Sequence, residues 1–203
     1  MNVLDWARKV RAIAQNGLLF TRDEFDRERY EKLQALADSI VSDELGRPLE
    51  EIKSLWKYDS GYVTPKVDVR GAVFKDEGIL LVRERSDGKW SLPGGWVDIN
   101  DTPSGAVARE IYEESGFRAR PVKLAALFDR QRHPHPPSMY HIYKLLFLCE
   151  LTGGEAKTSN ETDAVQFFPV DSLPELSPGR VTRGQIERMF EHQRQRDLPT
   201  DFD

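Results

Sequence analysis

The N-terminal part of the chain alternates between apolar and polar positions with the period of an α-helix. Apolar residues between positions 3 and 14 recur at steps of three and four, which places them on one helical face. The pair Asn16-Gly17 is expected to end this helix. Thr21 followed by Glu24 is typical of a capping box, so a second helix is predicted there, with its apolar side spread over residues 25–41.

A third, shorter helix is predicted over residues 49–55, after Pro48. Two amphipathic helices are too few to bury both of their apolar faces against each other. These faces are therefore expected to pack on the rest of the chain or on a second copy of it. Residues 1–57 hold 10 Lys or Arg and 11 Asp or Glu, a net charge of −1, which is unlike the basic face of a helical DNA-reading domain.

Strand patterns replace the helical ones beyond a linker that ends near residue 66. Alternating apolar residues predict a strand over 67–73, and the apolar run 79–82 predicts a second. Asp76-Glu77-Gly78 between them suits a hairpin turn. Trp90–Leu92 and Trp96–Asp98 are predicted to be short extended segments on either side of a Pro-Gly-Gly turn.

The rest of the chain mixes helix and strand signals. Helical spacing over residues 103–115 ends at Gly116, which accepts the left-handed backbone angles that often follow a helix. The remaining predicted elements are strands over residues 122–128, 142–150 and 165–169 and a terminal helix over 183–195. This mixture predicts the α+β class, with residues 1–57 as a helical region and residues 58–203 as the main domain.

Composition limits the classes of protein to consider. The chain has 203 residues, 39% hydrophobic and 31% charged, which suits a globular protein with a core. A formal net charge of −5 disfavours a protein that tracks long nucleic acids, although a few local cations could still hold a small anion. The single cysteine, Cys149, lies in an apolar run and is expected to be buried. No apolar run reaches the length needed to cross a bilayer, so a cytoplasmic protein without a membrane partner is expected.

Three glutamates form the most informative cluster. Glu110, Glu113 and Glu114 stand at positions i, i+3 and i+4 of a predicted helix, so the last two share a face with the first at about 5–6 Å between Cβ atoms. Like charges this close repel one another, and a cation stabilises them. Carboxylate oxygens suit Mg²⁺ or Mn²⁺, ions that also bind substrate phosphates. The alternative is an acidic helix face in solvent, the usual place for such a cluster.

Two further features stand at fixed spacings from these glutamates. Arg109 lies beside them and could orient one carboxylate through a bidentate pair. Gly94-Gly95 lets the backbone approach an anion closely. Together with the helix-ending Gly116, these features favour a metal-assisted phosphate site over a solvated surface.

The segment Gly95–Phe117 resembles the Nudix box. The matching pattern is Gly, five residues, an acidic residue, seven residues, Arg-Glu, an aliphatic residue, any residue, Glu-Glu, any residue, Gly and an aliphatic or aromatic residue. Asp101 stands where the family has glutamate, so its contact to Arg109 or to a metal-bound water has to be re-spaced. The resemblance implies the α/β/α sandwich of this family, with a mixed sheet.

Other segments resemble one Nudix branch in particular. They are Pro65–Gly71, Trp90–Trp96, Glu161-Thr162, Phe167-Phe168 and Leu173–Ser177. That branch carries an extra N-terminal helical region, which residues 1–57 fit, and acts on nucleoside diphosphates linked to another group. The resemblance implies hydrolysis of a pyrophosphate bond, as in CDP-choline and ADP-ribose pyrophosphatases. The products would be a nucleoside monophosphate and a second phosphorylated compound.

The resemblance also implies the metal ligands. Glu110, Glu113 and Glu114 are expected to bind Mg²⁺, or Mn²⁺ in its place, together with the backbone carbonyl of Gly95. Arg109 is expected to hold these carboxylates in position.

Several residues are candidates for the general base that activates water and for the groups that bind the phosphates. Nudix enzymes take their general base either from the box or from a downstream loop, so the candidates are Glu113 or Glu114 and, in the loop, Glu161. Arg70 and Arg83 lie on or at the ends of predicted strands and are candidates for binding phosphate. An exposed arginine on the outer face of the sheet is the alternative for Arg83.

The loop 129–137 is either a substrate-contacting loop or an ordinary connection. It holds two of the four histidines and three prolines. Histidine and cysteine ligands are too few nearby to favour zinc.

Three functions remain at this point. The first is the hydrolase, the second a non-catalytic nucleotide sensor with the same fold, and the third a hydrolase for RNA ends. The three intact glutamates favour the first, and the acidic balance of the chain disfavours the third. A homodimer formed through residues 1–57 is expected from their apolar faces and from the branch resemblance.

Overall fold

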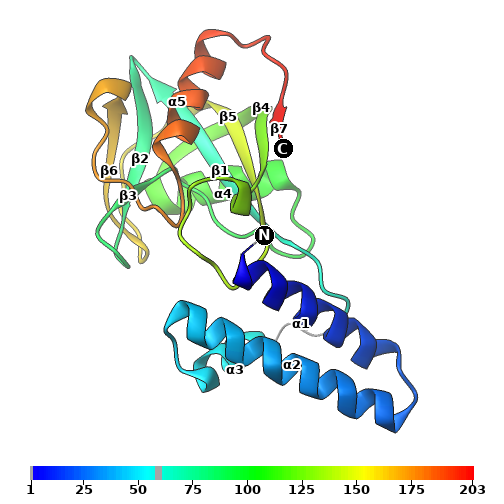
Figure 1. Cartoon of the computed structure of the whole chain (residues 1–203). Helices are drawn as coiled ribbons and strands as arrows, with labels where there is room; N and C mark the ends of the chain where they lie inside the picture. The colour runs from blue at the N-terminus through cyan, green and yellow to red at the C-terminus, as the bar shows by residue number, and fades with distance from the viewer. Residues whose placement is uncertain (1, 58–60) are drawn as a thin grey trace. The chain divides into compact units, whose positions relative to one another are not determined.

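The computed structural model describes residues 2–57 and 61–203, which form two compact units. The helical unit consists of Met1–Pro65 and Pro137–His141, and the sheet unit of Lys66–Pro136 and Ile142–Asp203 (Figure 1). A short segment from the middle of the chain therefore belongs with the N-terminal helices.

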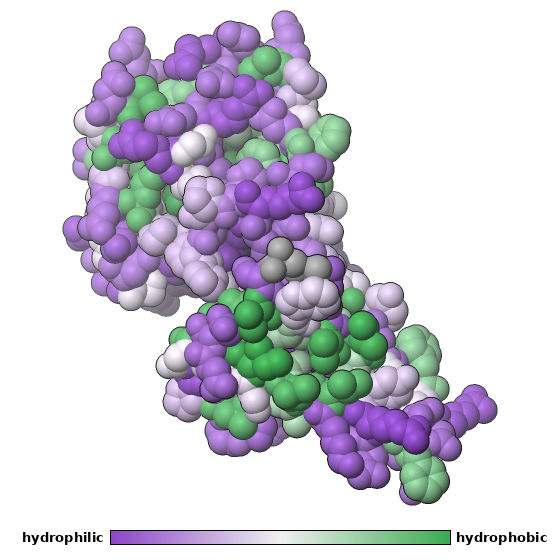
Figure 2. Space-filling model, in the orientation of Figure 1, coloured by the Kyte–Doolittle hydropathy of each residue, from purple (hydrophilic) through white to green (hydrophobic). Residues whose placement is uncertain are grey.

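Three helices build the helical unit, as the apolar pattern predicts. They are α1 (Val3–Phe20), α2 (Glu24–Leu45) and α3 (Leu49–Trp56). The core of the unit takes side chains from all three helices and from the segment 137–141, namely Leu4, Ala7, Val41, Ile52, Trp56 and Met139. Other apolar side chains stay more than half exposed, namely Trp6, Ile13, Phe20, Phe25 and Leu36. Figure 2 shows apolar side chains gathered on the visible face of this unit.

The predicted end of the first helix is wrong. α1 continues through Asn16-Gly17 to Phe20. A Cβ atom at Gly17 would lie 2.4 Å from the ring of Tyr30, so this glycine serves the close packing of α1 on α2 and does not end the helix. Helix-ending and helix-packing glycines look alike in a single sequence.

The predicted capping box of the second helix is also wrong. The N-cap is Asp23, whose side chain accepts a hydrogen bond from the Asp26 amide. Thr21 instead accepts from the Asp23 amide, within the turn that precedes the helix.

The sheet unit contains a mixed sheet in the order β3-β2-β1-β5-β4-β7, and β6 pairs with the other side of β2. The strands are β1 (Lys66–Lys75), β2 (Gly78–Glu84), β3 (Trp90–Ser91), β4 (Phe117–Asp129), β5 (Ile142–Gly154), β6 (Thr162–Pro169) and β7 (Asp201–Phe202). The pairs β1–β5 and β4–β7 are parallel, and the other pairs are antiparallel.

Most strand predictions are confirmed, with longer strands than the pattern indicated. The hairpin turn lies at Asp76-Glu77, between the paired residues Lys75 and Gly78. Trp96–Asp98, predicted to be extended, contributes only a single bridge between Trp96 and Asp68.

Helices cover both faces of the sheet, which confirms the α/β/α arrangement. α4 (Pro103–Ser115) packs through Ala106, Val107 and Ile111 on one face, and α5 (Arg183–Arg194) through Ile186, Met189 and Phe190 on the other. Two 3₁₀ helices, η1 (Arg130–Arg132) and η2 (Val170–Ser172), lie in the connections. No helix in the described ranges combines the length and the apolar character of a membrane span.

The position of α4 is fixed at both ends and in the middle. The Thr102 side chain caps its start and accepts from the Gly105 amide, and Gly116 follows its last residue with a φ of 76°. In the middle, a Cβ atom at Gly71 of β1 would lie 2.5 Å from the Ile111 side chain. The bare glycine lets α4 lie directly against the strand, which sets the height of the three glutamates above the sheet.

Buried Cys149 also agrees with its predicted place in the core. Its side chain is 6% exposed, and burial raises the pKa of the thiol to about 12. A thiol in this state is a poor nucleophile, so Cys149 contributes to packing.

Candidate metal centre

The glycine turn between Pro93 and Gly95 is held against β1 by backbone hydrogen bonds. The Gly71 amide donates to the Pro93 carbonyl and the Val69 amide to the Gly95 carbonyl, both at 2.9 Å. Gly94 has a φ of 145°, and a Cβ atom there would lie 2.0 Å from the Val69 carbonyl oxygen. Only glycine fits this position, because the turn packs directly on the backbone of β1.

The turn contacts α4 through the last of its three glutamates. The Gly94 amide donates to Glu114 Oε2 at 2.9 Å, and the Glu114 residue is 5% exposed. Burial raises the pKa of this carboxyl to about 8, and the nearby carboxylates Glu84 and Glu110 add to the shift. The Gly94 amide and the Arg70 guanidinium oppose it without cancelling it. Additional positive charge near Glu114 would therefore stabilise the ionised form of its carboxyl.

One guanidinium, that of Arg109, is shared by four acidic side chains. Its distances to carboxylate oxygens are 2.8 Å for Glu110, 2.9 Å for Glu113, 3.3 Å for Asp101 and 3.6 Å for Asp98. Bonds to these groups raise the pKa of Arg109 above its usual value despite partial burial. Four negative charges against one positive charge leave the cluster with a clear excess of negative charge.

The shorter acidic residue of the box keeps its contact. Asp101 reaches Arg109 with its carboxylate even though it lacks one methylene group of the glutamate found in the family. The substitution therefore preserves the link between the loop before α4 and the arginine that holds the carboxylates.

The chemistry of this donor set fits a hard divalent cation. Burial raises the pKa of Glu110, repulsion from Glu113 adds to the shift, and the Arg109 guanidinium opposes it. Within residues 2–57 and 61–203, no three acidic, histidine or cysteine side chains converge tightly enough to enclose an ion, and Arg109 holds Glu110 and Glu113 instead. A cation would compete with Arg109 for these oxygens. The Gly95 carbonyl already accepts one backbone bond and retains its second lone pair.

The loop that carries Glu161 is fixed to the end of α4. The Thr162 hydroxyl donates to the Glu114 carbonyl at 2.6 Å, and the Lys157 amide donates to the Ser115 carbonyl at 2.9 Å. Glu161 itself is exposed, and its charge contributes to the raised pKa of Glu84, whose largest cause is burial. The structure thus brings this downstream loop to the same edge as the box glutamates.

The two arginines considered for phosphate binding differ in their surroundings. Arg70 is 6% exposed and donates to Asp68, at 2.8 Å from Nε to Oδ1, and to the Leu92 carbonyl at 3.1 Å. This engagement favours a supporting role behind the glycine turn. The Arg83 side chain is 41% exposed and pairs with Asp163 at 2.6 Å, so it retains access to solvent.

Two residues near the centre were missed by the sequence reasoning. Glu84, the last residue of β2, is 3% exposed, and its Oε1 lies 2.9 Å from Arg180 Nε. Arg180 comes from the segment before α5 and also bonds to Ser177 and Ser86. Strand alternation places Glu84 on the same face as Val82, opposite Arg83, and so could have indicated that Glu84 is buried. Its partner Arg180 is remote in the sequence and has no local signal.

The histidine-containing loop is engaged within the sheet unit. His135 Nδ1 lies 2.7 Å from the Pro178 carbonyl, and burial lowers the pKa of the ring to about 4. Its Nε2 contacts Gln185 at 3.2 Å, and His133 contacts Asp203 at 3.2 Å. These contacts favour the connecting role for this loop.

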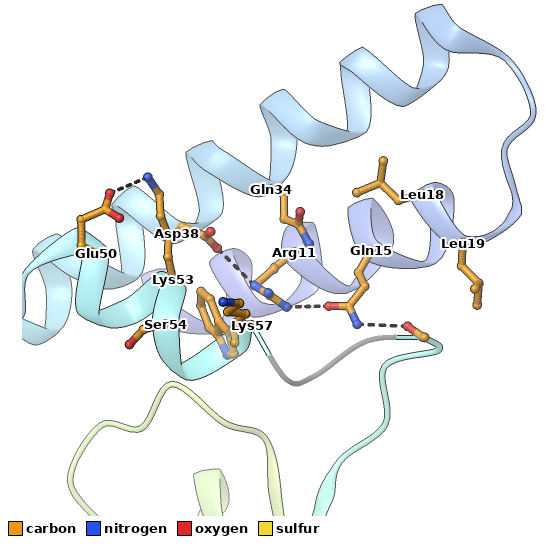
Figure 3. A pocket seen from close by; sticks show the side chains of 12 residues that line it. Arg11, Gln15, Leu18, Leu19, Gln34, Asp38, Glu50, Lys53, Ser54 and Lys57 are labelled. Carbon is orange, nitrogen blue, oxygen red and sulfur yellow. Dashed lines mark hydrogen bonds and ion pairs between the residues drawn. The ribbon is translucent and has the colours of Figure 1, made fainter.

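A hollow of about 670 Å³ lies in the helical unit (Figure 3). The guanidinium of Arg11, one of the lining residues, lies over the Trp56 ring, 3.9 Å from its centroid. Arg11 also donates hydrogen bonds to Asp38 and Gln15. Gln15 in turn donates to the Gly61 carbonyl. These polar groups satisfy one another. The residues that line this hollow and the box carboxylates belong to different units.

Family comparisons agree with the two-part organisation of the chain. A family model described as the NUDIX domain matches residues 64–190. A second, described as the UDP-X-like N-terminal oligomerisation domain, matches residues 1–56.

Known proteins resemble the chain along most of its length. YjhB of Bacillus subtilis (strain 168), to which ADP-ribose pyrophosphatase activity is ascribed, is 47% identical over 200 residues, or 98% of this chain and 96% of that protein. The crystal structure of an ADP-ribose pyrophosphatase from Streptococcus suis 89-1591 has a TM-score of 0.64 at 38% identity and covers 69% of this chain and 100% of its own. The crystal structure of a UDP-X diphosphatase has the same TM-score, 0.64, at 35% identity over 100% of both chains.

Replacing Gly94 by alanine tests the glycine turn. The added methyl group would collide with the Val69 carbonyl at an unfavourable φ, so we expect Gly94→Ala to lower the free energy of unfolding by about 2 kcal/mol or more. Chemical denaturation measures this difference. The matched control is Gly184→Ala on α5, where nothing lies within 4 Å, and this variant should be at least as stable as the original protein. Equal stability of both variants would contradict the described turn.

Proposed function

The chain belongs to the Nudix family of hydrolases, and from this premise we propose that it splits the pyrophosphate bond of a nucleoside diphosphate linked to a second group. The observation that carries the proposal is the carboxylate cluster of α4, which lies against the Pro93–Gly95 turn and has more negative charge than Arg109 can balance. The names of the relatives indicate ADP-ribose and UDP-linked compounds as the substrate class. A CDP-choline type of substrate belongs to the same chemical class.

Three glutamates would hold the divalent ion, with Mg²⁺ as the proposed ion and Mn²⁺ as its substitute. Glu110, Glu113 and Glu114 provide the carboxylates, and Gly95 provides a carbonyl oxygen. A divalent ion bound there would neutralise the charge of the pyrophosphate and activate water for the attack on phosphorus. The chain itself supplies the fixed spacing of the ligands, through the α4 periodicity and the Gly94 amide.

Arg109 acts on the arrangement of these ligands. It bonds to Glu110 and Glu113 and to the loop residue Asp101, so it ties the start and the middle of the box together. With a cation on the carboxylates, Arg109 would still hold Asp101 of the loop, and its charge would remain next to the site. A partly exposed arginine there can also approach a phosphate oxygen.

Glu161 is the general base in this proposal. The box glutamates serve as ligands, whereas Glu161 is exposed at the same edge. Its loop is bonded to the Glu114 carbonyl through Thr162, which gives the base a defined position relative to the metal ligands. Arg83, which is partly exposed, is proposed to bind a phosphate of the substrate. Arg70 is proposed to support the turn from behind.

The helical unit is proposed to join two copies of the chain. It matches the N-terminal oligomerisation domain, and several of its large apolar side chains are more than half exposed. Burial of such side chains against a second copy stabilises a dimer by removing apolar surface from water.

A panel of substrates tests the proposed activity. ADP-ribose, a UDP-sugar, CDP-choline and 5′-capped RNA would each be incubated with Mg²⁺ or Mn²⁺, and the products identified by mass spectrometry. We expect a nucleoside monophosphate and a phosphorylated partner from at least one of the small substrates, and no turnover after the addition of EDTA. Turnover of capped RNA alone, or of no compound in the panel, would contradict the proposal.

Substitution of the box glutamates tests the metal ligands. We expect Glu113→Gln and Glu114→Gln to lower kcat by about 10²-fold or more, because a neutral amide is a weak ligand for a hard cation. Titration calorimetry with Mn²⁺ should show weaker binding by both variants. Glu187→Gln, on the exposed side of α5, is the matched control and should behave like the original protein. Unchanged Mn²⁺ binding by the box variants would remove these residues from the site.

The general base has a distinct kinetic signature. Glu161→Gln should lower kcat by about 10²-fold while Mn²⁺ binding stays unchanged, since the residue accepts a proton and does not hold the ion. If kcat changes only slightly, the base lies in the box.

Light scattering tests the oligomer. The protein is expected to have twice the mass of a 23.3 kDa chain. Phe20→Glu places a charge on a side chain that is 70% exposed in the helical unit and should shift the protein towards the monomer. Phe202→Glu, at a residue that is 78% exposed in the sheet unit, is the matched control and should leave the mass unchanged. A single-chain mass for the original protein would overturn the dimer.

A further inference from the structure

A buried lysine lies behind the glycine turn. Lys144 on β5 stands directly opposite Asp68 on the parallel strand β1. The Lys144 residue is 1% exposed, and its Nζ lies 2.5 Å from Asp68 Oδ2. Ammonium groups are rarely buried so completely, because loss of hydration is costly. Neither the proposed metal ligands nor the general base explains this residue.

The carboxylate next to the lysine is bonded to an arginine that reaches the turn. Arg70 Nε donates to Asp68 Oδ1 at 2.8 Å, and Arg70 Nη1 donates to the Leu92 carbonyl at 3.1 Å. Leu92 immediately precedes the Pro93–Gly95 turn, whose Gly94 amide holds Glu114. Ammonium, carboxylate and guanidinium therefore form a buried row that ends at the backbone of the turn.

The shared oxygen of Asp68 determines how far Arg70 can move. Oδ2 lies 2.5 Å from the ammonium of Lys144 but 3.3 Å from Arg70 Nη2. Without the ammonium, the carboxylate could take both guanidinium nitrogens as a close bidentate pair. Arg70 would then move towards Asp68 and away from the Leu92 carbonyl.

We propose that Lys144 is a positioning residue for the hydrolytic site, because its contact with Asp68 keeps the Arg70 guanidinium against the Leu92 carbonyl and so fixes the glycine turn that holds Glu114. This inference rests on the proposed function, since the turn matters only if the carboxylate beside it works in hydrolysis. The row lies behind the turn, so Lys144 touches neither substrate nor metal.

The charges around Lys144 make the row sensitive to pH. Asp68 and Arg70 face it from β1, Arg130 from η1 and His135 from the loop that follows η1. Burial lowers the pKa of Lys144 to about 8, Arg70 and Arg130 add to the shift, and Asp68 opposes it. The ammonium is therefore lost in mildly alkaline solution, well below the usual value of 10.5.

Loss of the Lys144 charge does not by itself destabilise the fold. Between about pH 8 and the usual lysine pKa of 10.5, the unfolded chain binds more protons at Lys144 than the folded chain does. The free energy of unfolding therefore rises with pH as far as this residue contributes to it. A fall in kcat over the same pH range would report on positioning and not on stability.

The experiment compares Lys144→Met, Lys144→Arg and the surface control Lys75→Met in the full-length protein. Lys144→Met should lose about tenfold or more in kcat, with KM within about twofold, because the substrate contacts are untouched while the turn is displaced. Lys144→Arg keeps the charge and should recover most of kcat. Lys75 is exposed at the end of β1, and its substitution should change neither constant.

Nuclear magnetic resonance gives a readout that is independent of turnover. The amide resonances of Gly94 and Gly95 should shift in Lys144→Met and stay in place in Lys75→Met. Glu114, which accepts from the Gly94 amide, itself has a pKa of about 8, so the pH dependence is recorded in the Glu114→Gln background. There the two resonances should change as the pH rises through about 8, where Lys144 loses its proton. Adding Lys144→Arg should move this change to higher pH, since the guanidinium keeps its proton. This comparison remains available even if Lys144→Met does not fold.

Two results would overturn the inference. One is a Lys144→Met protein with unchanged kcat and unchanged Gly94 and Gly95 resonances. The other is an identical pH dependence of the Gly94 and Gly95 resonances in Glu114→Gln with and without Lys144→Arg. If the original protein cleaves no compound in the panel but its glycine resonances follow Lys144, the proposed function fails and the coupling between lysine and turn stands.

Discussion

The site depends on one electrostatic constraint: more carboxylates are held together than the local cations can balance. Arg109 alone is within 4 Å of four acidic side chains, and the buried Glu114 lies on the next turn of the same helix. Such a cluster is unstable unless the fold enforces it. The Gly94 amide, the Thr102 cap and the loop bonded to the Glu114 carbonyl together provide that enforcement. The unbalanced charge that results is what the proposed divalent cation would neutralise.

Local periodicity explains why the centre itself could be predicted. The three glutamates, Arg109 and the helix-ending Gly116 all belong to one continuous segment, so their spacing along the sequence translates directly into positions on α4. The same holds for the hairpin at Asp76-Glu77 and for most strands, whose pattern repeats over a few residues. The strong negative charge of the segment follows from the same spacing.

Contacts between distant segments explain what the sequence could not give. The partner of Glu84 is Arg180, and the partner of Asp68 is Lys144, 76 residues further along the chain. Neither pairing has a local signal. The sequence therefore leaves Arg70 as a candidate for binding phosphate, whereas in the structure it lies buried between Asp68 and the turn. Gly17 was misjudged for the same reason, because the ring that it accommodates belongs to another helix.

The bare backbone at Gly71 has a consequence for how this site can evolve. Because the Ile111 side chain packs against Gly71, α4 cannot lie closer to the sheet. A methyl group added at Gly71 would push the helix away from β1. Its carboxylates would then travel as a rigid set, keeping their mutual spacing while their distance from the glycine turn increased. Substitution of Gly71 would change the distance between α4 and the glycine turn for all three glutamates at once. Substitutions on α4 itself would affect single carboxylates.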